Sequence, residues 1–218
     1  METSAVSKQE ILSKYMEYVL EHGENPKSIY AFAKALTIEE KNIYEHYTSF
    51  EDIANSVYET FYEETHKMIS GDEIFIQSDA KNKLLLFYYT FFELLTANRS
   101  YVLLTLKENK NIIEKIQTLK GLRVKFREFI KSLPIETLDL KQDKLNQWNQ
   151  KSLEEMAWKQ LLFTIQFWLE DTSTSFEKTD IFIEKSVNAS FDLLDITPIK
   201  NLIDFGKFFF KEKIKPTL

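Results

Sequence analysis

The segment Ser28–Ile53 constrains the fold most strongly, because it contains two short helical patterns joined by a turn and followed by a third helix. Ser28 is suited to cap the first of these helices. Thr37 and Glu40 form a Thr-x-x-Glu pattern, which predicts a capping box at the start of the second helix. Two short helices joined by a tight turn define a helix-turn-helix, a unit that in many proteins places its second helix in the major groove of DNA.

The rest of the chain also favours helices, because helix-breaking residues are scarce. Only 4 Gly and 4 Pro occur in 218 residues, and 44% of the residues are hydrophobic, enough for a substantial core. Gly23 and Pro26 are placed to end the first helix. The sequence therefore predicts an all-α fold, with a small helix-turn-helix head at residues 1–50 and a larger helical bundle at residues 51–218.

The expected helices of this larger body follow from the spacing of apolar residues. They cover Lys81–Ala97, Tyr101–Leu106, Ile112–Leu133, Leu153–Glu170 and Phe176–Leu194. A loop is expected at residues 70–79, and residues 135–150 are polar enough to form a loop or a weak helix.

The composition also narrows the class of protein. The chain has no cysteine, so it forms no disulfide and no thiolate metal site. Its first residues, METSAVSKQE, have neither the basic start nor the apolar run of a signal peptide. No apolar stretch reaches the roughly 18–20 residues that cross a bilayer. We therefore expect a cytoplasmic protein with no membrane partner.

Several small and apolar positions of the first quarter of the chain recur at the offsets used by the helix-turn-helix of TetR-like transcriptional regulators. They are Ala33, Ile38, Ile43, Tyr44, Tyr47 and Ile53. The chain therefore resembles that family. Two positions depart from its pattern, because Thr37 replaces the usual Gly of the turn and Phe50 replaces a Lys that meets phosphate.

The resemblance implies a homodimeric regulator whose heads bind a double-stranded DNA operator and whose bodies enclose a small hydrophobic effector. Two helices of each subunit would pair in a four-helix bundle. The implied DNA contacts fall on Lys27, Ser28, Lys41, Asn42, Tyr44 and His46. Lys and Tyr side chains reach phosphates, and Asn42 is suited to read a base edge.

The charge of the head argues against DNA binding. Residues 1–60 contain 5 Lys, no Arg and 11 Asp plus Glu, so they hold all of the net charge of −6. DNA binding depends on Lys and Arg displacing counterions from phosphates. A second hypothesis is therefore a degenerate TetR-like protein that no longer binds DNA and binds a protein or a small molecule instead.

Aromatic side chains at helical spacing mark two stretches of the body. The six candidates for effector binding are Tyr88, Phe91, Phe92, Phe163, Phe167 and Trp168. Such stripes more often form a core than a ligand site, but the polar tips of Tyr and Trp suit a buried pocket. Phe182, Val187 and Phe191 are alternatively part of the dimer face, and the sequence leaves pocket and interface undivided.

An enzyme has no positive support in the sequence. Glu63 and His66 form one Glu-x-x-His step, a spacing found in di-iron helix bundles, but the required second step is missing. No catalytic triad, phosphate-binding glycine loop or pair of catalytic carboxylates is recognisable. We expect no metal, no cofactor and no catalysis, and a metal-dependent helical enzyme stays a third hypothesis.

The tail FGKFFFKEKIKPTL places Phe205, Phe208 and Phe209 on one face of an expected last helix, with lysines nearby. A basic amphipathic helix of this kind can lie on an anionic membrane surface. We expect instead that it docks its Phe face on the body and leaves the lysines in water.

Overall fold

The computed structural model describes residues 6–107, 117–135 and 143–194, with the side chains of the last range described from residue 150 onward. These residues form helices and turns and contain no strand, which confirms the all-α prediction. The predicted tail helix with Phe205, Phe208 and Phe209 lies outside the described residues, as does the start of the helix predicted from Ile112.

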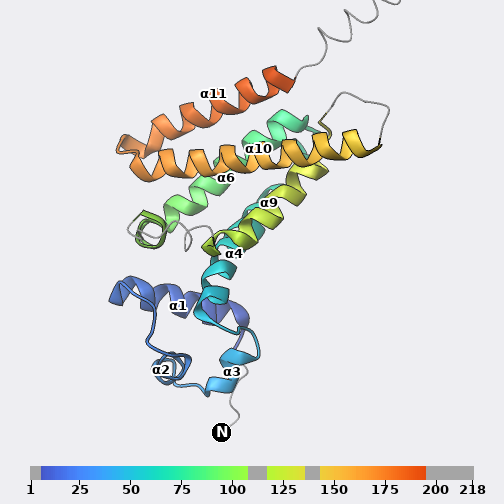
Figure 1. Cartoon of the computed structure of the whole chain (residues 1–218). Coiled ribbons are helices and arrows are strands. Elements are labelled where there is room, and N and C mark those ends of the chain that lie inside the picture. The colour runs from blue at the N-terminus through green and yellow to red at the C-terminus, as the bar shows by residue number, and fades with distance from the viewer. Residues whose placement is uncertain (1–5, 108–116, 136–142, 195–218) are drawn as a thin grey trace, which may run out of the picture.

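Four helices build the head and its connection to the body, and the head lies in the lower part of Figure 1. They are α1 (Lys8–His22), α2 (Ile29–Ala35), α3 (Glu40–Tyr44) and α4 (Phe50–Ser70). α2 and α3 are two short helices in contact, at the place where the helix-turn-helix was predicted. α4 begins beside α1 in the head and continues into the body, so the two parts share one helix.

The body contains four further long helices and four short segments. They are α5 (Glu73–Gln77), α6 (Ala80–Ala97), α7 (Arg99–Val102), the π-helical turn η1 (Leu103–Lys107), α9 (Lys120–Ser132), α10 (Asp143–Glu170), the 3-10 turn η2 (Thr174–Phe176) and α11 (Glu177–Leu194). α4 packs against α6 and α9, α9 against α10, α10 against α11, and α11 against α6. The long helices therefore close a ring around one core (Figure 1).

Two boundaries differ from the sequence-based prediction. The predicted loop at 70–79 contains α5, because Asp72 caps a helical turn by accepting the N–H of Ile74. The helix predicted over Leu153–Glu170 begins already at Asp143. Its first residues are polar and have no apolar stripe, so the periodicity of the sequence could not reveal them.

The predicted ends of the first two head helices are confirmed. Gly23 adopts the left-handed conformation at φ 74° and donates its N–H to the carbonyl of Val19, which closes α1. The hydroxyl of Ser28 accepts the N–H of Ala31 at 3.1 Å and starts α2.

The predicted capping box of Thr37 and Glu40 is wrong. Thr37 lies after the end of α2 with a φ of 59°, in the left-handed region. Glu39 is the residue that precedes α3, and its N–H donates to Oδ1 of Asn42 at 3.2 Å. The turn therefore requires the left-handed backbone conformation at position 37, where the family usually has Gly. Thr37 is β-branched, so it adopts this conformation at a cost in backbone strain.

We expect Thr37→Gly to raise the free energy of unfolding by about 1 kcal/mol, because glycine adopts this φ without strain. Urea unfolding followed by circular dichroism measures the change. Thr37→Ala is the matched control, since it keeps the Cβ atom and should gain less. A loss of stability in the glycine variant would show that the turn is not strained.

Aromatic rings join the head to the body. Tyr15 of α1 stacks on Phe50 with ring centroids 6.0 Å apart, and Phe32 of α2 meets both rings edge-on. Deeper in the body, the hydroxyl groups of Tyr58 in α4 and Thr105 in η1 are 2.6 Å apart. Phe50 therefore packs in the core of the head, where the family pattern has a phosphate-contacting Lys.

The turn between α10 and α11 depends on the carboxylate of Asp171. It accepts the N–H and the hydroxyl of Ser173 with one oxygen, and the N–H and the hydroxyl of Thr179 with the other. Burial of Asp171 raises its pKa, but these four hydrogen bonds outweigh it and lower the pKa to about 2. The guanidinium of Arg99 lies over the rings of Trp168 and Phe176 and closes the same turn.

We expect Asp171→Asn to lower the free energy of unfolding by about 2 kcal/mol at pH 7, because the amide loses hydrogen bonds that the carboxylate accepts. A depressed pKa stabilises the fold above the ordinary value of 3.8, and this stabilisation is lost as the pH falls towards about 2. The difference between wild type and variant should shrink in that range.

Thermal unfolding at several pH values provides the measurement, and Asp192→Asn serves as the control because Asp192 is exposed on α11. A difference between wild type and Asp171→Asn that stays constant down to pH 2 would contradict the assignment.

Candidate functional site

The outer surface of the helix-turn-helix carries the predicted DNA contacts. Ile43 is fully buried and fixes α3 on the head, which leaves Lys41 exposed and Tyr44 exposed at 52%. Lys27 and Ser28 are exposed at the start of α2, and His46 is exposed just after α3. The fold therefore brings the six residues to one small unit, with their backbone positions set by the two short helices.

Four of these six residues already have partners within the head. Nζ of Lys41 lies 2.8 Å from Oε2 of Glu39, and this contact raises the pKa of Lys41. Oδ1 of Asn42 caps α3, and the hydroxyl of Ser28 caps α2. A ring nitrogen of His46 lies 3.0 Å from the carbonyl of Val6. DNA binding would have to compete with the ion pair of Lys41.

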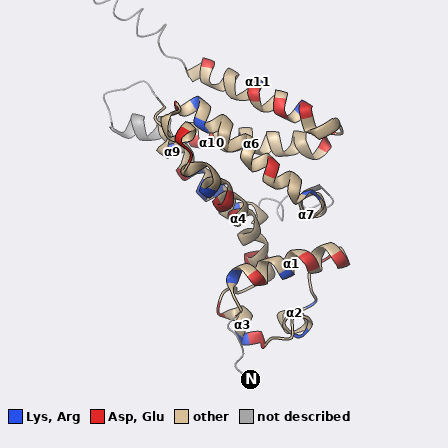
Figure 2. Ribbon diagram, turned by 180° about the vertical axis from the view of Figure 1, so that it is seen from behind, with Lys and Arg blue, Asp and Glu red and all other residues tan. Residues whose placement is uncertain are grey.

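The charges of the head do not form a continuous basic face. Figure 2 shows Lys side by side with Asp and Glu on α1 and α3. A binding mode with many phosphate contacts is therefore disfavoured, and any DNA contact would rest on a few cations.

The six aromatic candidates for effector binding lie in different environments. Tyr88, Phe91, Phe92 and Trp168 are buried in the core, where Tyr88 stacks on Phe92 at 6.1 Å. Phe163 is exposed at 68%, and Phe167 stacks on Phe182 of α11 at 4.6 Å. The fold brings Phe92 and Trp168 together, at 6.1 Å between ring centroids, and separates them from Phe163.

The cavity between η1, α9 and α10, which we call the α9–α10 cavity, has a volume of about 410 Å³. Its described apolar lining is Leu106, Leu119, Trp158, Leu162, Ile165 and Leu169, and its polar lining is Gln117, Lys120, Arg123 and Gln166. Apolar walls with a few polar groups are typical of small-molecule sites. None of the six aromatic candidates lines this cavity. The candidates were chosen from the pattern within single helices, whereas the cavity forms where segments distant in sequence pack together.

A second hollow, also of about 410 Å³, lies between α6 and the turn that precedes α11. Phe92 and Trp168 contribute to its lining, together with Tyr89, Glu93, Thr96, Ser175, Phe176, Thr179 and Asp180. Two of the six candidates therefore border a hollow, although both are almost completely buried. The α9–α10 cavity offers more apolar surface and is the better candidate for an apolar ligand.

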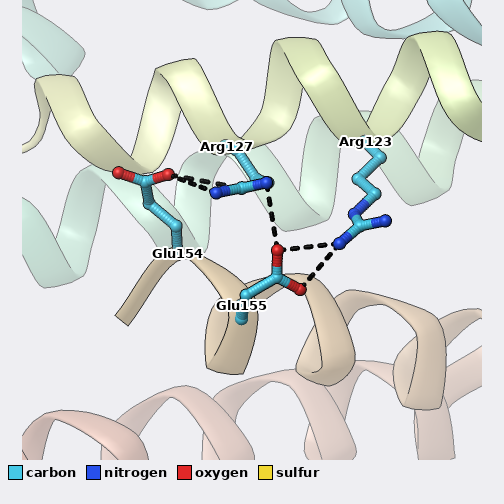
Figure 3. A network of polar contacts seen from close by, with 4 residues as sticks. All are labelled: Arg123, Arg127, Glu154 and Glu155. Atoms are coloured by element: carbon cyan, nitrogen blue, oxygen red, sulfur yellow. Dashed lines mark hydrogen bonds and ion pairs between the residues drawn. The ribbon is translucent and has the colours of Figure 1, made fainter. Parts of the chain in front are cut away.

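An ion-pair network fixes the two helices that form the cavity (Figure 3). Nη2 of Arg123 donates to both oxygens of Glu155, at 2.7 and 2.9 Å. Arg127 bridges Glu154 and Glu155, at 2.9 and 3.0 Å. The hydrogen bond from Arg123 lowers the pKa of Glu155. Because these pairs link α9 to α10 along one side, the geometry of the cavity wall is held by charge as well as by packing.

The outer sides of α10 and α11 carry exposed apolar side chains. Met156 and Phe163 lie on α10, and Ile181 and Leu193 lie on α11. A shallow groove runs beside them and is lined by Phe167, Lys178, Ile181, Phe182, Lys185 and Ser186. Of the predicted interface residues, Phe182 and Phe191 are half-buried, whereas Val187 is fully buried in the core and cannot contribute to an outer face.

Within the described part of the chain, no three His, Asp or Glu side chains are grouped closely enough to hold a metal ion. None of the helices in that part is both long and apolar enough to cross a membrane.

The family described as Tetracyclin repressor-like, C-terminal domain, matches residues 83–209. This match covers more than half of the chain and falls on the body, whereas the sequence pattern noted above falls on the head. The chain therefore belongs to the family of TetR-like regulators. The comparison with curated proteins found no match.

Proposed function

We propose that this protein is a transcriptional regulator whose head binds a double-stranded DNA operator and whose body binds a small hydrophobic effector. The observation that carries the proposal is the combination of a TetR-like body with an outward-facing α3 on a helix-turn-helix head. Regulators of this family are generally not enzymes. We propose that this one acts in the cytoplasm without catalysis.

A route for coupling the two sites runs through η1. Leu106 lines the α9–α10 cavity, and the neighbouring Thr105 contacts the hydroxyl of Tyr58 in α4. Tyr101, one turn earlier, packs on Tyr58 at 6.3 Å, and its helix α7 contacts α1 of the head. A ligand that shifts Leu106 would therefore disturb contacts on which the position of the head depends, and π-helical turns often occur at such functional hinges.

The proposed assembly is a homodimer through α10 and α11. Their exposed Met156, Phe163, Ile181 and Leu193 would be covered by the same helices of a second copy. Two heads of one dimer would then contact half-sites about one DNA turn, roughly 34–36 Å, apart. A ligand that favours one separation of the heads changes the affinity for DNA.

We expect Lys41→Ala and Tyr44→Ala to weaken DNA binding without unfolding the body. Removing one phosphate contact should lower the slope of log affinity against log salt by about 1 in the Lys41 variant. Fluorescence anisotropy with a duplex from upstream of the gene, between about 50 and 200 mM salt, measures both quantities. Lys34→Ala, an exposed lysine of α2 outside the predicted contact set, is the control.

Equal affinities for wild type and both variants would place the contact surface elsewhere. No binding at low salt would favour the second candidate function, a regulator-shaped protein that binds a protein or a small molecule and not DNA. That candidate is supported by the net charge of −6 in residues 1–60 and by the pairing of Lys41 with Glu39.

We expect Phe163→Asp to convert the dimer into a monomer, because a buried unpaired carboxylate would destabilise the apolar interface. Val124→Asp is the matched control, since Val124 is equally apolar and exposed at 51%, but lies on α9. Light scattering after size-exclusion chromatography distinguishes twice the chain mass of 25.9 kDa from the single mass. A dimer that persists in Phe163→Asp and dissociates in Val124→Asp would assign the interface to α9.

A further inference from the structure

The α9–α10 cavity is asymmetric in charge. Its only charged lining residues within the described chain are Lys120 and Arg123, both in the first turn of α9, and no described carboxylate lines it. The rest of the wall is apolar, apart from the neutral amides of Gln117 and Gln166.

The ion pair of Arg123 does not use all of its donors. Its Nη2 serves Glu155, and Figure 3 shows the other terminal nitrogen turned away from that carboxylate. Its Nε is buried and has no hydrogen-bond partner in the described residues. A buried donor without an acceptor is unfavourable, so an acceptor supplied by a ligand would stabilise this wall.

Among the described side chains, the two cations that line the cavity differ in their partners. Arg123 and Arg127 are matched by Glu154 and Glu155, which form a closed network of two positive and two negative groups. Lys120 lies beside this network and is in no ion pair with a described residue. A negative group on a ligand would be attracted by Lys120 and could accept from Arg123, whereas a positive group would be repelled by Lys120.

We propose that the α9–α10 cavity selects molecules that join an apolar body to a single anionic group, such as a carboxylate, which Lys120 and Arg123 bind. This inference rests on the proposed function, because it names the class of effector for the same cavity. The apolar body lies against Trp158, Leu162 and Ile165, and the anion lies at the start of α9. Charge-assisted hydrogen bonds from Lys and Arg give the site its preference for the anion.

The test uses the full-length protein and three ligands with the same ten-carbon chain: decanoate, decanol and decylammonium. Each ligand competes with N-phenyl-1-naphthylamine, a neutral apolar dye whose fluorescence rises in apolar cavities. We expect decanoate to bind about 10-fold more tightly than decanol, and decylammonium to bind most weakly. Lys120→Gln should lower the affinity for decanoate about 10-fold and leave that for decanol unchanged.

Lys131→Gln is the matched control, because Lys131 is an exposed lysine in the last turn of the same helix and does not line the cavity. Its decanoate affinity should equal that of the wild type. Equal binding of decanoate and decanol, or a preference for decylammonium, would overturn the proposed anion selectivity while leaving an apolar effector site in place. No binding of the dye or of any of the three ligands would overturn the effector site itself, and with it this inference.

Discussion

The contact between Tyr58 and Thr105 joins the three parts of the molecule on which any regulatory role depends. Tyr58 lies on α4, the helix shared by head and body, and Thr105 lies on the π-helical turn beside the α9–α10 cavity. Around it, Tyr101 packs on Tyr58, and α7 touches α1. Tyr58 and Tyr101 are buried and Thr105 is half-buried, so we propose that a change at the cavity wall would alter contacts of the head.

The head combines an outward-facing α3 with a net negative charge. Its three helices are held by buried aromatic and aliphatic side chains, so α3 does not depend on DNA for its position. Most of the described acidic residues of the head are exposed, and some form local pairs, such as Glu39 with Lys41. Binding of DNA would release Lys41 from that pair, which makes the affinity lower than in a head with many free cations. Fewer phosphate contacts also make the affinity less steeply dependent on salt.

The sequence predicted the features that depend on local chemistry. Gly23, Ser28 and the inward-facing Ile43 act as their positions along the helices indicate. Thr37 was misread as a cap, because a capping motif and a left-handed turn residue differ in backbone conformation, which the sequence pattern does not specify. The helix periodicity showed which apolar residues share a helix face. It could not show whether such a face lines the core, a cavity or the surface.

The α9–α10 cavity was beyond sequence reasoning for the same physical reason. Leu106, Arg123 and Trp158 are far apart in the chain and meet only through the packing of η1, α9 and α10. The aromatic stripes predicted that Tyr88 and Phe91 contact an effector, yet these rings are buried in the core of the bundle. The one sequence feature that could have pointed to the cavity is the pair Lys120 and Arg123 at the start of the amphipathic helix α9. Charged residues at a helix surface usually face water, so this pair alone does not predict a ligand site.

We propose that the cavity and the head are energetically coupled, and the Kd for DNA with and without saturating decanoate measures this coupling. We expect the Kd for DNA to change by about 5-fold or more, with DNA changing the Kd for decanoate by the same factor. An unchanged Kd for DNA, in protein that demonstrably binds both, would contradict it.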